Sequence, residues 1–154
     1  MNLYLVQHGE AYDKSENPER PLTPAGKRDV AAMANILSRF SLNAPEIWHS
    51  GKARSLQTAE LLLPAMAPKG RCCLRPGIEP KDPAALIAHE LRNRETDLVL
   101  VGHLPHISRL AACLLVGDEG RELVLFQKGG VAALHRNEAG QWGIEWFIVP
   151  SLIV

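Results

Sequence analysis

The sequence has no excess of charge of either sign and no long apolar run. Its 17 lysines and arginines balance 17 aspartates and glutamates. Proteins that bind nucleic acids or acidic membranes through charge are strongly basic, so we expect neither partner, and any preference for an anion must be local. No apolar run approaches the roughly 20 residues that a membrane-spanning helix needs, and the first residues lack the features of a signal peptide. We therefore expect a soluble, cytoplasmic protein.

Cysteine is also scarce. Cys72 and Cys73 are adjacent, and Cys113 lies in an apolar pattern with helical spacing. Three cysteines in this arrangement match neither a disulfide framework nor a zinc site, so we expect reduced thiols, as in the cytoplasm. A chain of 154 residues can bury a sufficient core without such cross-links. Since we find no internal repeat or low-complexity segment, we predict one domain over residues 1–154.

Short apolar runs alternate with amphipathic segments along the chain. Apolar runs of strand length predict strands in residues 3–6, 45–50, 71–74, 96–103, 131–136 and 142–149. Apolar residues at helical spacing predict helices from Pro24 to Phe40, with Thr23 as N-cap, and over residues 51–66, bent or ended near Pro64. Two more helices are predicted from Asp82 and Pro83 to about Arg94, and over residues 105–116.

This alternation predicts an α/β fold. Parallel neighbouring strands need a crossover connection, and crossover helices cover the sheet. The expected architecture is therefore a three-layer sandwich, with a mostly parallel sheet and helices on both faces. In such sheets, ligands bind beyond the carboxyl ends of the strands.

Polar residues follow three of the predicted strands. The first strand is followed by Gln7, His8, Gly9 and Glu10. The second ends in His49 and Ser50, with Arg54 one helical turn later, and another ends in Gly102 and His103, with His106 beyond it. These groups are expected at one edge of the sheet, where imidazoles and a guanidinium beside a helix N-terminus favour an anion. The remaining histidines, His49, His89 and His135, are interpreted as structural.

Four segments of the sequence resemble the histidine phosphatase superfamily. They are "LYLVQHGEA", "PLTPAG", "SGKARSLQTAELL" and "LVLVGHLPHISRLAACLL", and they occur in the family's order. The short chain resembles the small SixA-type phosphohistidine phosphatases within this phosphoglycerate mutase-like group. The resemblance implies a nucleophilic histidine at His8, a phosphate-binding arginine at Arg54 and a second catalytic histidine at His103.

The sequence departs from this family pattern at two positions. Gly51 replaces the usual proline after the serine, which is a small change. Gln7 stands where the family has arginine in its Arg-His-Gly motif. Arginine offers a fixed charge and a planar fork for two phosphate oxygens, whereas a glutamine amide is neutral. The exchange therefore predicts a weaker phosphate site and a reduced rate.

The chemistry implied is phosphoryl transfer through a covalent intermediate. Neutral His8 attacks phosphorus, and Arg54 and protonated His103 stabilise the charge on the phosphoryl oxygens. Ser50 and Gln7 are expected to add phosphate contacts. The proton donor for the leaving group is Glu79 or, alternatively, Glu10. No metal ion or other cofactor is expected.

The expected substrate is phosphohistidine on a partner protein such as a phosphotransfer domain, with the enzyme a monomer. The segments between the motifs are too short for a lid, so the rim should be open to a protruding side chain. Three alternatives remain. The substrate is a small phosphoester enclosed by residues 13–21 and 76–83; the protein is a catalytically weakened phosphate-binding or scaffolding homologue; or His8, Glu10, His103 and His106 bind a metal.

Overall fold

Residues 1–153, which the computed structural model describes, contain one six-stranded sheet. Val154, the last residue of the predicted domain, lies outside the described residues. The strands are β1 (Asn2–Gln7), β2 (Glu46–His49), β3 (Arg71–Leu74), β4 (Leu98–Gly102), β5 (Val131–Arg136) and β6 (Trp142–Ile148). They lie in the order β3-β2-β4-β1-β5-β6. The four strands from β3 to β1 are parallel, whereas β5 and β6 pair antiparallel.

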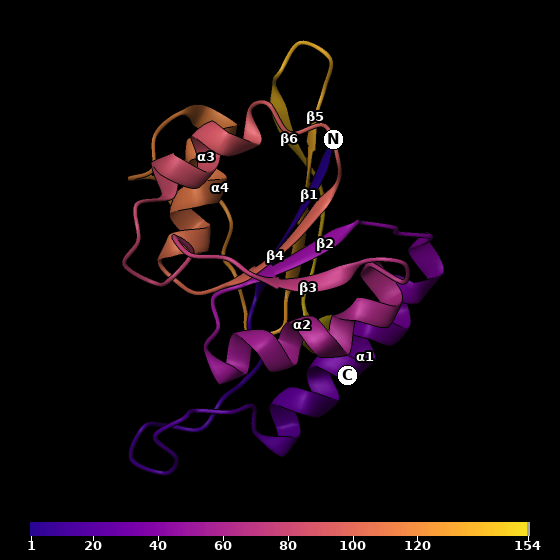
Figure 1. Cartoon of the computed structure of the whole chain (residues 1–154), viewed down its shortest axis with the longest axis vertical. Coiled ribbons are helices and arrows are strands. Elements are labelled where there is room, and N and C mark those ends of the chain that lie inside the picture. Colours follow the sequence, from indigo (N-terminus) through magenta and orange to yellow (C-terminus); the bar gives the residue numbers. More distant parts are fainter. Residues whose placement is uncertain (154) are drawn as a thin grey trace.

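Helices cover both faces of this sheet (Figure 1). They are α1 (Pro24–Leu37), α2 (Ala53–Met66), α3 (Ala84–Leu91) and α4 (His106–Val116), with short 3-10 helices η1 (Ser38–Phe40) and η2 (Pro150–Leu152). α1 and α2 pack on one face, and α3 and α4 pack on the other. The predicted α/β sandwich is confirmed.

The central strands are apolar on both sides because both faces are covered. Leu3 and Leu5 of β1 pack in the core beneath α3 and α4. Tyr4 and Val6, which alternate with them, pack in the core beneath α1 and α2. This pattern is typical of parallel strands buried on two faces. Polar residues can therefore be accommodated only at the strand ends.

The helix boundaries differ from the predictions in three places. Thr23 is the N-cap of α1 as predicted, but the helix ends at Leu37; Phe40 lies in η1, is 46% exposed and stacks on Trp146. α2 begins at Ala53 rather than at Gly51, and it ends at Met66, shortly after Pro64, as predicted. α3 begins after Pro83 and ends at Leu91, short of Arg94. Its last carbonyl groups accept hydrogen bonds from the Arg136 guanidinium, a distant residue that the local pattern could not reveal.

Two sequence-based expectations bear on the protein's environment. None of the helices in residues 1–153 has both the length and the apolar character that a membrane span requires. Cys72, Cys73 and Cys113 are free thiols.

A substitution at Leu5 tests the packing of the core around β1. Leu5 is fully buried in β1, so Leu5→Ala removes apolar contacts and leaves a cavity. We expect the free energy of unfolding to fall by about 2–5 kcal/mol. Urea denaturation measures this change, with Leu86→Ala on the exposed face of α3 as control, expected to cost less than about 0.5 kcal/mol. Equal losses in the two variants would contradict the described core.

Candidate active site

The carboxyl ends of β1, β2 and β4 meet at one edge of the sheet. These strands are neighbours in the order β2-β4-β1. Gln7 is in register with Gly102, and His49 with Val101. The polar residues that follow the three strands therefore lie side by side, as the sequence predicted.

His8 presents a neutral nitrogen at this edge. Its Nδ1 lies 2.7 Å from the carbonyl oxygen of Gly9. Because a carbonyl only accepts, Nδ1 carries the proton and Nε2 keeps its lone pair. The Nε–H of Arg54 donates to this lone pair at 3.3 Å. The buried imidazole therefore offers Nε2 to an incoming electrophile, with a guanidinium beside it.

Two hydroxyl groups hold the first turn of α2, and with it Arg54, against the strand ends. The Thr58 hydroxyl donates to the Arg54 carbonyl at 2.7 Å and accepts from the Gly9 N–H at 3.0 Å. The Ser55 hydroxyl donates to the Val101 carbonyl at 2.8 Å and accepts from the Ser50 N–H at 3.2 Å. Both side chains are fully buried. The sequence analysis missed them, although two hydroxyl residues three positions apart in the first two turns of a predicted helix were the available signal.

His103 faces His8 from the end of β4. The two ring centroids lie 5.0 Å apart. The Ser50 hydroxyl lies 2.6 Å from His103 Nε2, so in this structure the predicted phosphate ligand contacts the second histidine. His103 Nδ1 is buried and has no hydrogen-bond partner among residues 1–153.

Both imidazoles are neutral at physiological pH in the free site. Burial, together with the charges of Arg54, Lys128 and Arg20, lowers the pKa of His8 to about 4, against the opposing effect of the hydrogen bond to Gly9. Burial, with smaller contributions from His8 and Arg54, lowers the pKa of His103 to about 3. His103 is therefore neutral in the free site, whereas the sequence analysis expects it to be protonated during phosphoryl transfer. A bound phosphoryl dianion would favour its charged form.

Cations surround the histidines although the whole chain is neutral. Arg54, Arg20 and Lys128 act electrostatically on His8, and Lys52 acts on His103. Arg20 and Lys128 were not predicted from the sequence. Arg20 lies in the 12–22 loop, where its Nε donates to the Tyr12 carbonyl at 3.1 Å. Because the chain as a whole is neutral, attraction for an anion needs a local excess of positive charge. These cations supply it at this edge of the sheet.

The two candidate acids lie in different places. The Glu79 carboxylate pairs with the Lys52 ammonium at 3.4 Å, next to the N-terminus of α2. It is close enough to raise the pKa of Arg54 against the larger lowering effect of burial. Glu10 is exposed, and its carboxylate accepts the Thr23 hydroxyl at 2.8 Å, at the N-terminus of α1.

The remaining histidines take no part in the hydrogen bonds among His8, Arg54, Ser50 and His103. His49 Nδ1 accepts the Gly51 N–H at 3.2 Å, and His135 Nδ1 lies 2.8 Å from the Asn2 side-chain oxygen. His89 is exposed on α3, and His106 is fully buried in α4. Among residues 1–153, no three His, Cys, Asp or Glu side chains are placed to hold a metal ion. The four residues of the metal alternative therefore do not form a ligand set.

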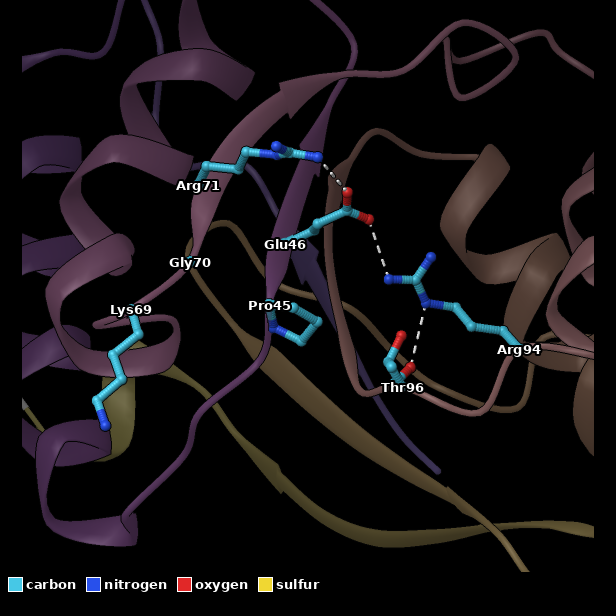
Figure 2. Close-up of a pocket in the computed structure, with 7 residues that line it drawn as sticks. All are labelled: Pro45, Glu46, Lys69, Gly70, Arg71, Arg94 and Thr96. Carbon is cyan, nitrogen blue, oxygen red and sulfur yellow. Dashed lines mark hydrogen bonds and ion pairs between the residues drawn. The ribbon is translucent and has the colours of Figure 1, made fainter.

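A pocket of about 630 Å³ lies at the amino end of β2, the opposite end of that strand from His49. Figure 2 shows the residues that line it. Its carboxylate, Glu46, already pairs with Arg71 at 3.3 Å and with Arg94 at 3.0 Å. The Glu46 carboxylate is thus already held by two guanidinium groups, and the lining contains no histidine or cysteine. The histidine edge, rather than this pocket, is the candidate site.

The pKa values can be checked in solution. We expect the ring C–H resonances of His8 and His103 to stay unshifted between pH 5.5 and 8 in NMR titrations, because both pKa values lie below the ordinary 6.5. Added inorganic phosphate should raise the His103 midpoint towards neutrality. A midpoint near 6.5 in the phosphate-free protein would contradict the buried geometry.

The same pKa values link stability to pH. The unfolded chain takes up protons at both histidines below about pH 6.5, before the folded protein does. Protonation of these two histidines in the unfolded chain therefore lowers the free energy of unfolding as the pH falls from about 6.5 towards 4. Above about pH 6.5 this loss of stability is absent.

Comparison with known proteins identifies the fold. No family model matches the sequence. An uncharacterised protein of Picosynechococcus sp. (strain ATCC 27264 / PCC 7002 / PR-6) is 31% identical over 147 residues, covering 90% of this chain and 87% of the relative.

Three solved structures illustrate the structural likeness. The protein histidine phosphatase SixA, complexed with tungstate, has a TM-score of 0.87 at 23% identity and covers 100% of both chains. The alpha-ribazole phosphatase of Shigella flexneri has a TM-score of 0.75 at 14% identity, covering 97% of each chain. A phosphoserine phosphatase mutant of Entamoeba histolytica, in complex with phosphoserine, has a TM-score of 0.74 at 16% identity, covering 99% of each. The chain therefore belongs to one family with the Picosynechococcus protein and has the fold of the histidine phosphatase superfamily, as its four motifs predicted.

Proposed function

We propose that the protein is a phosphatase that works through a phosphohistidine intermediate on His8. The observation that carries this proposal is the geometry around His8 Nε2. The carbonyl of Gly9 fixes the proton on Nδ1, and Arg54 lies 3.3 Å from the free lone pair. A neutral imidazole nitrogen beside a fixed cation suits attack on an anionic phosphoryl group, because the cation attracts the anion while the nucleophile stays unprotonated.

The reaction proceeds in two displacements. In the first, the bond between His8 Nε2 and phosphorus forms as the bond to the leaving group breaks, and the leaving group takes up a proton. In the second, a water oxygen attacks phosphorus and the bond to Nε2 breaks, which releases inorganic phosphate and neutral His8. Arg54 stabilises the phosphoryl oxygens in both steps. His103 is charged only once the anion is bound, and then donates a hydrogen bond to it.

Glu79 is the better candidate for the leaving-group acid. It lies on the rim of the site, joined to Lys52 just before α2. Glu10 is instead held by the Thr23 hydroxyl at the start of α1. Ser50 is placed to exchange its hydrogen bond with His103 for one with a phosphoryl oxygen.

The proposed substrate is phosphohistidine on a partner protein. Leu104, directly after His103, is 40% exposed, and Leu123 and Leu125 are exposed in the segment that leads to Lys128. Exposed apolar side chains beside a site suit contact with another protein. The bond from phosphorus to a readily protonated imidazole also breaks more easily than an alkyl ester bond. The related fold of a protein histidine phosphatase adds support.

A monomer in the cytoplasm fits these features. The three cysteines are free thiols, which a reducing compartment preserves. His8, Arg54, Ser50 and His103 contact one another within the same chain, so the proposed chemistry needs no residue from a second copy.

One observation favours a second function, that of a catalytically weakened phosphate-binding protein. Gln7, next to His8, brings no charge to the site, and its buried Oε1 has no hydrogen-bond partner among residues 1–153. Such a protein would bind phosphate without turnover, whereas the proposed enzyme releases phosphate catalytically.

Covalent labelling tests the role of His8. After rapid quenching with labelled substrate, we expect acid-labile, base-stable label on His8. His8→Ala should lower kcat by roughly a thousandfold or more, because it removes the nucleophile. His89→Ala, on the exposed face of α3, is the control and should keep both label and rate. Label on another residue, or near-normal turnover by His8→Ala, would overturn the mechanism.

Substrate comparison tests the protein partner. We expect kcat/KM to be at least tenfold higher for a phosphorylated phosphotransfer domain than for any of a panel of sugar phosphates and nucleotides. Leu104→Ser should raise KM for the phosphoprotein but leave hydrolysis of an aryl phosphate unchanged, because only the larger substrate reaches this side chain. Ile144→Ser, on exposed β6, is the matched control. A metabolite that exceeds the phosphoprotein tenfold would instead support closure of residues 13–21 and 76–83 over a small phosphoester.

A further inference from the structure

A pocket of about 520 Å³ opens beside the end of β1. It is lined by Gln7, Asp29, Phe126, Gln127, Lys128, Pro150 and Ser151. Gln7 directly precedes His8, so the pocket adjoins the proposed nucleophile. The proposed mechanism leaves this pocket, and the two polar side chains Gln7 and Lys128, without a role.

The Gln7 side chain is only 7% exposed, yet one end of its amide is unsatisfied. The buried Oε1 has no hydrogen-bond partner among residues 1–153. A buried polar atom without a partner is costly and uncommon in folded proteins. An amide has one acceptor end and one donor end. A donor that binds Oε1 would therefore leave the NH₂ group to donate elsewhere.

Lys128 is positioned by the backbone of the proposed nucleophile. The next residue, Gly129, donates its N–H to the carbonyl oxygens of Gln7 and His8 at 2.9 and 3.2 Å. Gly129 has a φ of +77°, and a Cβ there would lie 3.1 Å from Pro150 Cγ. Glycine thus permits the close turn that holds Lys128 beside the end of β1.

Among residues 1–153, the Lys128 side chain has no hydrogen-bond or ion-pair partner, so its ammonium is free to bind an anion. The Lys52 ammonium pairs with Glu79, and the Arg20 Nε donates to the Tyr12 carbonyl. Within the described residues, no carboxylate lies at ion-pair distance from Lys128, although Asp29 lines the same pocket. The Lys128 charge lowers the pKa of His8, next in effect to Arg54 among the nearby charges, so it acts at the reacting nitrogen.

We propose that Lys128 is the second cation of the phosphoryl site and acts together with Gln7. This inference rests on the proposed function. With substrate bound, the ammonium donates to Gln7 Oε1 and to a phosphoryl oxygen, while the Gln7 NH₂ group donates to another phosphoryl oxygen. An arginine, which the family resemblance implies at position 7, would supply both the donors and the charge. In this protein the two properties are divided between Gln7 and Lys128.

Two measurements test the role of Lys128: kcat/KM for an aryl phosphate, and the Kd of inorganic phosphate by calorimetry. Lys128→Ala should lower kcat/KM and raise the Kd, each by about ten- to a hundredfold, the effect of losing a charged hydrogen bond. Lys128→Arg should stay within about threefold of wild type. Lys69→Ala, in the distant pocket of Figure 2, should change neither quantity.

A double-mutant cycle tests the division of roles. Gln7→Arg should restore most of the activity lost in Lys128→Ala, and should give a smaller gain in the wild-type background. Circular dichroism and urea denaturation confirm that each variant is folded. If Lys128→Ala stays within twofold of wild type in both kcat/KM and phosphate affinity, or if Gln7→Arg changes both backgrounds equally, the proposal is wrong.

Phosphate affinity separates this inference from the proposed function. A wild-type protein that binds phosphate in a Lys128-dependent way but shows no turnover would overturn the proposed enzymatic function and support the proposed role of Lys128. Turnover that does not depend on Lys128 would support the proposed enzymatic function and overturn the proposed role of Lys128. A wild-type protein that neither binds phosphate nor turns over would overturn both.

Discussion

The hydrogen bonds between the first two turns of α2 and three strand ends determine the geometry of the candidate site. The Thr58 hydroxyl joins the Arg54 carbonyl to the backbone after His8, and the Ser55 hydroxyl joins the ends of β2 and β4. Because each hydroxyl both donates and accepts, the helix cannot shift along the sheet without breaking a buried hydrogen bond. Arg54 is therefore placed before any ligand arrives, and its Nε lies against His8 at no further ordering cost.

Placement in the interior also sets the protonation of the site. Burial among cations keeps both imidazoles neutral, so the site is rich in donors and positive charge but holds its proposed nucleophile unprotonated. The net charge of the whole chain is zero, so attraction for an anion depends on where Arg20, Lys52, Arg54 and Lys128 are brought together. An anion at this edge would in turn favour protonation of His103, which couples binding to the charge state that stabilises the phosphoryl group.

Much of the fold could be predicted because its signals are local. Apolar runs identified the strands, Thr23 identified the start of α1, and the alternation of elements identified the class. The missed boundaries have tertiary causes. Phe40 leaves the helix to stack on Trp146, and the carbonyl groups at the end of α3 are satisfied by Arg136 of β5, so neither boundary follows from neighbouring residues alone.

The sequence by itself determined which residue types stand at the strand ends, since His8, Arg54 and His103 occur within recognisable motifs and within predicted elements. Only the tertiary structure decided which of their atoms meet. The tautomer of His8 depends on the Gly9 carbonyl, the contact of His103 depends on Ser50 from another strand, and the neutrality of both rings depends on burial. Arg20 and Lys128 lie in irregular segments without a motif, and their effect on His8 exists only because the folded chain brings distant charges close together. Such long-range electrostatic and packing effects depend on distance in space, which a linear pattern does not record.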